Sequence, residues 1–228
     1  YPTRIAREEA DALYRAIQKT KISAPPTTCL SPIGEKRILE GLQKECDADF
    51  FTVSTRPPAV YRGNPFQIEV GIAWGRPGSD SLDVDQEGRI TKTRKKRAKV
   101  DTEDLLGNAD ESVRVLRFAN RVPLLFQQSG CCFTKAVSAT SWRNYGLSQS
   151  KGSIPTGSAV ILIHMASAWV PFTSESKEAI ASYPEIIKEV KLALQECGRK
   201  LGTYLRRRKR MRRESERRSI FERYIGEI

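Results

Sequence analysis

The longest helical pattern in the chain constrains its fold more than any other feature. From Pro184 onward, apolar residues recur at helical spacing, in a stripe made up of Ile186, Val190, Ala193, Leu194, Cys197, Leu201, Tyr204 and Leu205. A basic run over residues 206–213 follows with no second apolar face, and apolar residues return only at Ile220, Phe221, Tyr224 and Ile225. We therefore predict one helix over 184–223, roughly 60 Å long at 1.5 Å per residue, which leaves its own domain as a lever.

The rest of the chain carries the patterns of a mixed α+β domain. Four segments are predicted to be strands, at residues 50–55, 66–74, 113–118 and 158–167. Shorter helices are predicted at residues 4–19 and 35–44, and a third follows residues 128–130 and runs to about residue 139. Together these segments predict a four-stranded sheet backed by helices, with a small helical segment in front and the lever helix at the end.

Composition limits the compartment and the partners. The chain has 228 residues, a formal net charge of +12 and no apolar run long enough to cross a membrane. Its five cysteines contain no Cys-x-x-Cys pair, which favours a reducing, intracellular compartment over a disulfide framework or zinc. Basic runs at residues 92–99 and 206–218 point to a polyanion, although each could also be a solvated surface. The charged segment 76–110 is predicted to be a mobile insertion.

No catalytic constellation can be assembled from the sequence. The single histidine, His164, lies in an apolar strand and is expected to be a core residue with satisfied hydrogen bonds. We expect no metal site, and we do not expect this chain alone to be a catalyst. Because the sequence lacks an initiator methionine and begins in what resembles a helix cap, we also expect it to be part of a longer protein.

Two cationic positions remain as candidates. Lys177 lies on a polar loop between the last strand and the lever, where a hydrogen bond to an anion could bias the lever's position. Arg143 lies in the run Trp142-Arg143-Asn144-Tyr145, in which arginine could bind phosphate and the aromatic residues could stack or serve as an anchor. The alternatives are a solvated lysine and an aromatic pair that only packs on the core.

Five segments resemble the B subunit of DNA topoisomerase VI, and the resemblance covers nearly the whole chain except residues 76–110. The segments are residues 24–35, 56–66, 117–128, 142–147 and 170–181. The resemblance implies that residues 1–45 are the end of a helix-two-turns-helix domain with its linker. Residues 46–228 would then be a transducer domain, similar to those of gyrase B and the mismatch-repair protein MutL. The nucleotide-binding motifs of the family's ATPase domain do not occur in this sequence.

The resemblance also implies roles for particular residues. Lys177 matches the switch lysine that reaches the γ-phosphate of ATP. Trp142, Arg143 and Tyr145 match a DNA-contact motif, in which arginine here replaces the family's lysine. Both residues are cations, so phosphate binding is kept, but the planar guanidinium can change the geometry. Phe221, Tyr224 and Ile225 would lie toward the A subunit.

The family's assembly completes the expectation. It implies ATP and Mg²⁺, bound mostly outside this chain, and as partners the A subunit, a second copy of the B subunit and duplex DNA, with no membrane. The location would be the cytoplasm or nucleoid of an archaeal-type cell, or the nucleus of a eukaryote. The function implied is the coupling of ATP use to DNA cleavage and strand passage in a type IIB topoisomerase. A basic DNA-binding module without a motor, or a structural adaptor of a topoisomerase-like nuclease, is the alternative.

Overall fold

The computed structural model describes residues 4–20, 26–46, 48–75, 112–226 and the backbone of 82–84 and 90–92. Side chains of residues 212, 215, 216 and 218–226 lie outside this description. The elements are α1 (Arg7–Lys19), η2 (Thr27–Cys29), α2 (Glu35–Glu45), β1 (Phe50–Thr55), β2 (Ala59–Tyr61), β3 (Asn64–Trp74), β4 (Leu82–Val84), β5 (Ile90–Lys92), β6 (Arg114–Ala119), β7 (Val122–Pro123), α3 (Cys132–Ser138), η3 (Trp142–Tyr145), β8 (Ala159–Ser167) and α4 (Pro184–Gly226).

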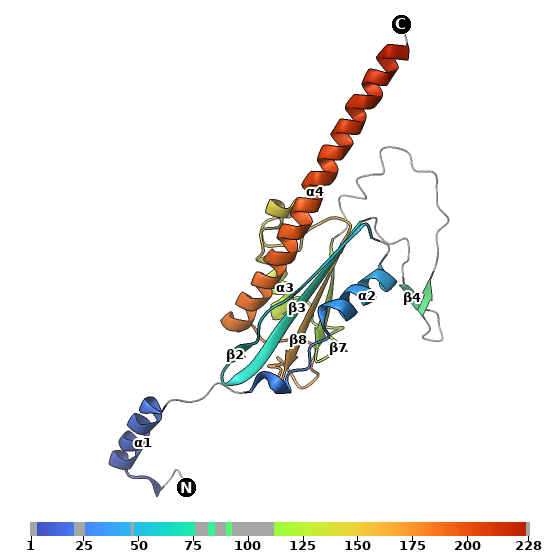
Figure 1. The fold of residues 1–228 in the computed structure, drawn as a ribbon. Helices are drawn as coiled ribbons and strands as arrows, with labels where there is room; N and C mark the ends of the chain where they lie inside the picture. Colours follow the sequence, from blue (N-terminus) through green and yellow to red (C-terminus); the bar gives the residue numbers. More distant parts are fainter. Residues whose placement is uncertain are drawn as a thin grey trace.

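One mixed sheet forms the centre of the domain (Figure 1). Its strands run in the order β1-β3-β8-β6-β7, and β2 pairs with β3 beside β1. The pair β3–β8 is antiparallel over nine residue pairs, whereas β6 and β8 run parallel. The α+β prediction is confirmed, and all four predicted strands are present. The sheet nevertheless has six strands instead of four, because β2 and β7 are too short to show an alternating pattern.

The central strand β3 is buried on both faces. Ile68, Val70 and Ile72 are fully buried in the main core, on the side covered by α3 and α4. Ala73 belongs to a second, smaller core under α2, on the opposite face, and Gly71 points the same way. A Cβ on Gly71 would lie 2.7 Å from Leu42 Cδ1, so only glycine lets α2 approach this closely.

Helix α2 packs on β1 and β3. The predicted domain boundary at 45/46 therefore divides α2 from the sheet that it covers. Helix α1 differs, because none of its residues is buried and Leu13, Tyr14 and Ile17 are each more than half exposed.

The predicted lever helix is confirmed as α4, which has 43 residues and is therefore about 65 Å long. Six residues of the predicted stripe are fully buried, at Ile186, Val190, Ala193, Leu194, Cys197 and Leu201. Tyr204 and Leu205 are partly buried at the end of the stripe. Beyond it, Arg208 makes an ion pair of 2.6 Å with Asp49 and lies over the ring of Trp74. The helix then continues past the sheet (Figure 1).

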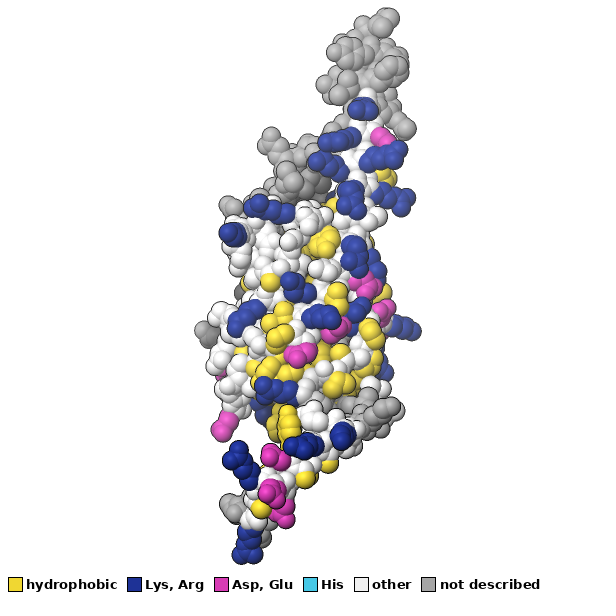
Figure 2. Space-filling model, turned by 90° about the vertical axis from the view of Figure 1, so that its left-hand side faces the viewer, with side chains coloured by type: hydrophobic (Ala, Val, Ile, Leu, Met, Phe, Trp, Pro, Cys, Tyr) yellow, Lys and Arg dark blue, Asp and Glu magenta, His cyan; other side chains and the backbone are white. Residues whose placement is uncertain are grey.

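The predicted insertion at 76–110, including the basic run 92–99, lies outside the described residues. The exceptions are the backbones of β4 and β5, which pair as a two-stranded antiparallel sheet. The second basic run lies on α4, where Figure 2 shows Lys and Arg side chains gathered around the helix above the body of the domain. The exposed members of this group include Arg206, Arg207, Lys209, Arg210 and Arg213.

Candidate functional site

The loop that carries Lys177, residues 173–178, is closed at its base. Phe172 and Ile180 form an isolated antiparallel bridge, and Thr173 N donates to Ala179 O at 2.9 Å. The carbonyl of Ile180 also accepts a hydrogen bond of 2.9 Å from Cys132 N at the start of α3. The ends of the loop are therefore fixed to the core, while residues 173–177 are exposed.

Lys177 is held in a left-handed backbone conformation with φ of 55°. This conformation costs a residue with a side chain roughly 1–2 kcal/mol, so the surrounding loop stabilises it. The turn bond from Lys177 N to Ser174 O measures 3.2 Å, and the hydroxyls of Ser174 and Ser176 lie 2.8 Å apart. Among the described residues, no carboxylate lies within ion-pair distance of the Lys177 ammonium group. A cation presented this way, between β8 and α4, can accept an anion from outside the chain.

The helical turn η3 directs its side chains to different places. Trp142 is fully buried, and its Nε1 donates to Val137 O at 2.8 Å. Its ring lies edge-on to Tyr145, with centroids 6.1 Å apart. Arg143, between them, is exposed. The Trp142 ring is therefore not available to stack on a base in this conformation. Of the two roles that the sequence allowed for the aromatic residues, stacking and anchoring, Trp142 has the second.

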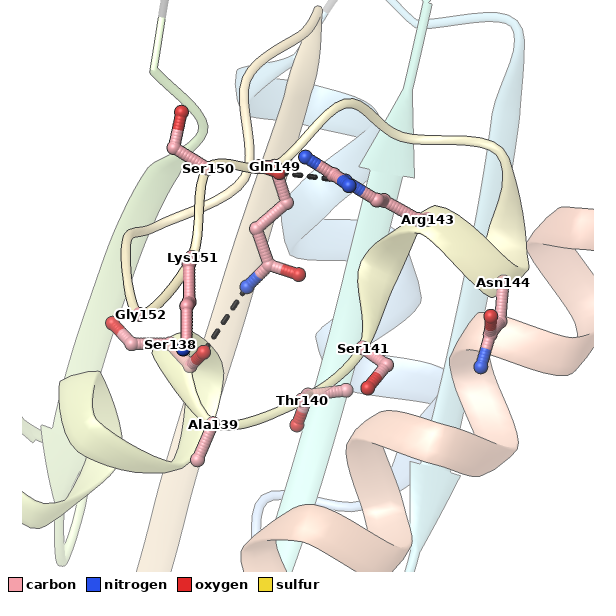
Figure 3. A pocket seen from close by; sticks show the side chains of 10 residues that line it. All are labelled: Ser138, Ala139, Thr140, Ser141, Arg143, Asn144, Gln149, Ser150, Lys151 and Gly152. Atoms are coloured by element: carbon pink, nitrogen blue, oxygen red, sulfur yellow. Dashed lines mark hydrogen bonds between the residues drawn. The ribbon is translucent and has the colours of Figure 1, made fainter.

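A shallow pocket of about 470 Å³ lies beside Arg143 (Figure 3). It is lined by Ser138, Ala139, Thr140, Ser141, Arg143, Asn144, Gln149, Ser150, Lys151 and Gly152. Gln149 holds the pocket together, since its Nε2 donates to Ser138 O and Ser153 O, and its Oε1 accepts from Trp142 N. Arg143 Nε donates to Gln149 O at 2.8 Å, which orients the guanidinium.

The charges around this pocket are of one sign. Arg143 and Lys151 both line it, and no Asp or Glu does. The terminal nitrogens of Arg143 make no hydrogen bond within the described part of the chain and remain available for a ligand. Two cations with several hydroxyl groups form a surface suited to a phosphate. Sequence reasoning missed Lys151, because only the fold brings residues 138–144 and 149–152 to one pocket.

A buried polar network fixes the segment that precedes α2. Glu69, fully buried, accepts hydrogen bonds from Ile33 N at 2.7 Å and Gly34 N at 2.8 Å. His164 Nδ1 lies 2.8 Å from the same carboxylate, and His164 Nε2 accepts from Arg121 N at 3.0 Å. Burial favours the neutral acid, but the hydrogen bonds outweigh it and hold the pKa of Glu69 below its usual value. The prediction that His164 is a satisfied core histidine is confirmed.

The guanidinium of Arg121 adds a second attachment, since its Nη2 donates to Ser31 Oγ at 2.9 Å and Pro32 O at 3.0 Å. The segment before α2 is thus tied to two different parts of the sheet. These hydrogen bonds join it to β3 through Glu69 and to the β6–β7 turn through Arg121.

The remaining predicted site residues, Phe221, Tyr224 and Ile225, lie in α4, but their side chains are outside the described set. Within the described residues, no three His, Cys, Asp or Glu side chains cluster as a metal site would require. The same residues contain no helix that is both long and apolar enough to span a membrane.

The central sheet therefore leads through a cationic loop, fixed at its base, into a helix that projects beyond the sheet. Residues 25–217 match the family model described as "Topoisomerase VI B subunit, transducer". The chain therefore belongs to the topoisomerase VI B-subunit transducer family, which confirms the resemblance seen in the sequence.

The curated proteins to which the chain is similar include two that are named as the B subunit of type 2 DNA topoisomerase 6. The protein from Methanococcoides burtonii is 44% identical over 227 residues, which are 100% of this chain and 32% of that protein. The protein from Archaeoglobus fulgidus is 44% identical over 209 residues, 92% of this chain and 30% of that protein. The chain thus spans about a third of the length of these relatives.

Among solved structures, the B subunit of DNA gyrase from Myxococcus xanthus superposes with a TM-score of 0.39 and 14% identity. The match covers 72% of this chain and 38% of that one. That likeness is too weak to place individual residues.

Proposed function

We propose that this chain couples ATP binding and hydrolysis, carried out elsewhere in a longer protein, to DNA cleavage and strand passage by a partner A subunit. The assembly would be an ATP-dependent type IIB DNA topoisomerase with two copies of each subunit. Membership of the transducer family supports this proposal. The observation that carries it is Lys177, an exposed cation held in a strained conformation on a closed loop between β8 and α4.

In this proposal Lys177 is the switch residue. Its ammonium group would donate a hydrogen bond to the γ-phosphate of ATP bound in a separate domain. Because the loop base is hydrogen-bonded to α3 and the chain then continues into α4, a displacement of Lys177 would be passed on to the lever. ATP and Mg²⁺ would be held mostly outside this chain, as the family resemblance implies.

The proposed DNA contact is the pocket of Arg143 and Lys151, with Trp142 and Tyr145 holding the turn in place. A duplex phosphate would bind at Arg143, and Lys151 would add positive charge to the same pocket. The basic stretch of α4 adds positive charge along the lever (Figure 2). Phe221, Tyr224 and Ile225, at the far end of the lever, would dock on the A subunit. The enzyme would act where the chromosome lies, in the cytoplasm or nucleoid of a cell like those of its archaeal relatives.

The test replaces Lys177 in the full-length protein, assembled with the A subunit. Lys177→Ala should lower ATP turnover and relaxation of supercoiled DNA by about ten- to a hundred-fold, because a charge-assisted hydrogen bond contributes roughly 1.5–3 kcal/mol. Lys36→Ala is the matched control, since Lys36 is 90% exposed on α2 and far from the loop in sequence. Parent-like rates in Lys177→Ala would refute the switch role.

A further inference from the structure

Two glycines lie in α4 where the turn η3 packs against the helix. Gly198 and Gly202 are both buried and stand four residues apart, so they lie on one face of the helix. Glycine is the poorest helix former after proline, and a long helix has no need of it for its own stability. Their presence therefore requires a packing reason.

Tyr145 supplies that reason. A Cβ built on Gly198 would lie 2.6 Å from Tyr145 Cδ2 and 2.7 Å from Cε2, and one on Gly202 would lie 3.3 Å from Tyr145 Cα. The tyrosine ring and its backbone therefore rest directly on the bare backbone of α4. Contacts this close are possible only where no side chain intervenes.

The turn is held from two sides. Trp142 anchors it in the core through the hydrogen bond to Val137 O, and Tyr145 anchors it on the lever. Next to Tyr145, a Cβ on Gly146 would lie 3.0 Å from Leu205 Cδ1, so Leu205 of α4 also meets the turn. Arg143 lies between the two anchors and lines the pocket (Figure 3).

We propose that Gly198 and Gly202 are positioning residues that seat Tyr145 on the lever, so that the Arg143 phosphate contact and α4 move as one body. Binding of a DNA phosphate at Arg143 would then act on the lever directly, without passing through the sheet. This inference rests on the proposed function, because it takes Arg143 as the DNA contact. Gly198, Gly202 and Tyr145 would not touch DNA themselves.

The experiment uses the full-length protein assembled with the A subunit and a short fluorescein-labelled DNA duplex. Gly198→Ala should displace the turn, weaken DNA binding several-fold and lower the ratio of DNA-stimulated to DNA-free ATP turnover. Tyr145→Ala should do the same. Combining the two should cause no further loss, because the added methyl group no longer meets a ring.

Gly41→Ala is the matched control. Gly41 is an exposed glycine in α2 with nothing within 4 Å of a built Cβ, so the same substitution should leave DNA binding unchanged. If Gly198→Ala fails to fold in a thermal melt, Gly202→Ala takes its place, since its Cβ meets the tyrosine at the looser distance of 3.3 Å.

Three results would overturn the inference. If the losses add in the double variant, Gly198 and Tyr145 do not act through one contact, and the positioning role of the glycines is refuted. The same role is refuted if Gly198→Ala behaves like Gly41→Ala while Arg143→Ala weakens DNA binding. Both results would leave the DNA contact at Arg143 standing. An Arg143→Ala variant with parent-like DNA affinity would refute the DNA contact itself, and with it the positioning role of Gly198 and Gly202.

Discussion

Trp142 and Arg143 are adjacent in sequence, but we expect their substitutions to affect different properties. Trp142 is fully buried, and replacing a buried Trp by Ala typically costs about 3–5 kcal/mol. For a domain of this size each kcal/mol shifts Tm by about 2–4 °C, so Trp142→Ala should lower Tm by roughly 6–20 °C. Arg143 is exposed and makes one hydrogen bond to Gln149 O, so Arg143→Ala should lower Tm by no more than a few degrees.

DNA binding should instead depend on Arg143 and little on Trp142. Each phosphate contact contributes about 0.9 to the slope of log K against log salt concentration, so Arg143→Ala should reduce that slope by about 1. Arg143→Lys should keep the slope, because the charge remains. Trp142→Phe, which keeps most of the packing, should bind DNA like the parent.

The assay combines thermal melts with fluorescence anisotropy of a labelled duplex at several salt concentrations. Trp142→Phe is the variant that separates the two effects, since it keeps most of the packing in the core but would disturb a direct contact between Trp142 and DNA. The reasoning would be wrong if Trp142→Phe weakened DNA binding as much as Arg143→Ala while its Tm stayed at the parent value. That result would mean that Trp142 leaves the core to meet DNA.

Three further predictions concern the rest of the domain. Because hydrogen bonds hold the pKa of Glu69 below its ordinary value of 4.5 despite burial, its stabilisation should be complete above pH 4.5 and be lost as pH falls through the lowered folded pKa. In denaturant melts, the free energy of unfolding of Glu69→Gln should fall less steeply with decreasing pH below 4.5 than that of the parent. An equally steep fall would argue against this role of Glu69. Truncation after Arg213 should leave a folded domain that no longer co-purifies with the A subunit, and undiminished co-purification would move the docking surface elsewhere. Deletion of residues 78–109 should leave Tm within a few degrees, because this charged segment cannot bury enough apolar surface to offset its ordering entropy, and a large fall would place it in the core.

Local patterns were enough to predict the main elements. The alternation in β3 and the apolar stripe of α4 arise because each element buries one set of positions against the sheet or the core, and that spacing is visible in sequence. The apolar stripe ends at Leu205, which is also the last described apolar residue of α4 that packs against the main core. Arg208 extends this contact, but its partner Asp49 is 159 residues away in sequence, so no local pattern predicts the pair.

The candidate sites depended more on tertiary structure. The sequence identified Lys177 and Arg143 as cations, but it could not predict the φ of Lys177 or the inward turn of Trp142. Lys151 joins Arg143 only because Gln149 bonds to both Ser138 and the backbone of η3. The helix glycines cannot be recognised as a site until Tyr145 is seen resting on them.

The central claim is that Lys177 links bound nucleotide to the position of the lever. The most direct measurement is the distance between the two levers of the assembled enzyme, from spin labels on Glu214→Cys, an exposed site on α4. Cys29 and Cys46 would be replaced by serine, since the other three cysteines are buried. The account predicts that a non-hydrolysable ATP analogue shifts this distance in the parent, and that Lys177→Ala binds the analogue without the shift. An equal shift in Lys177→Ala would contradict it.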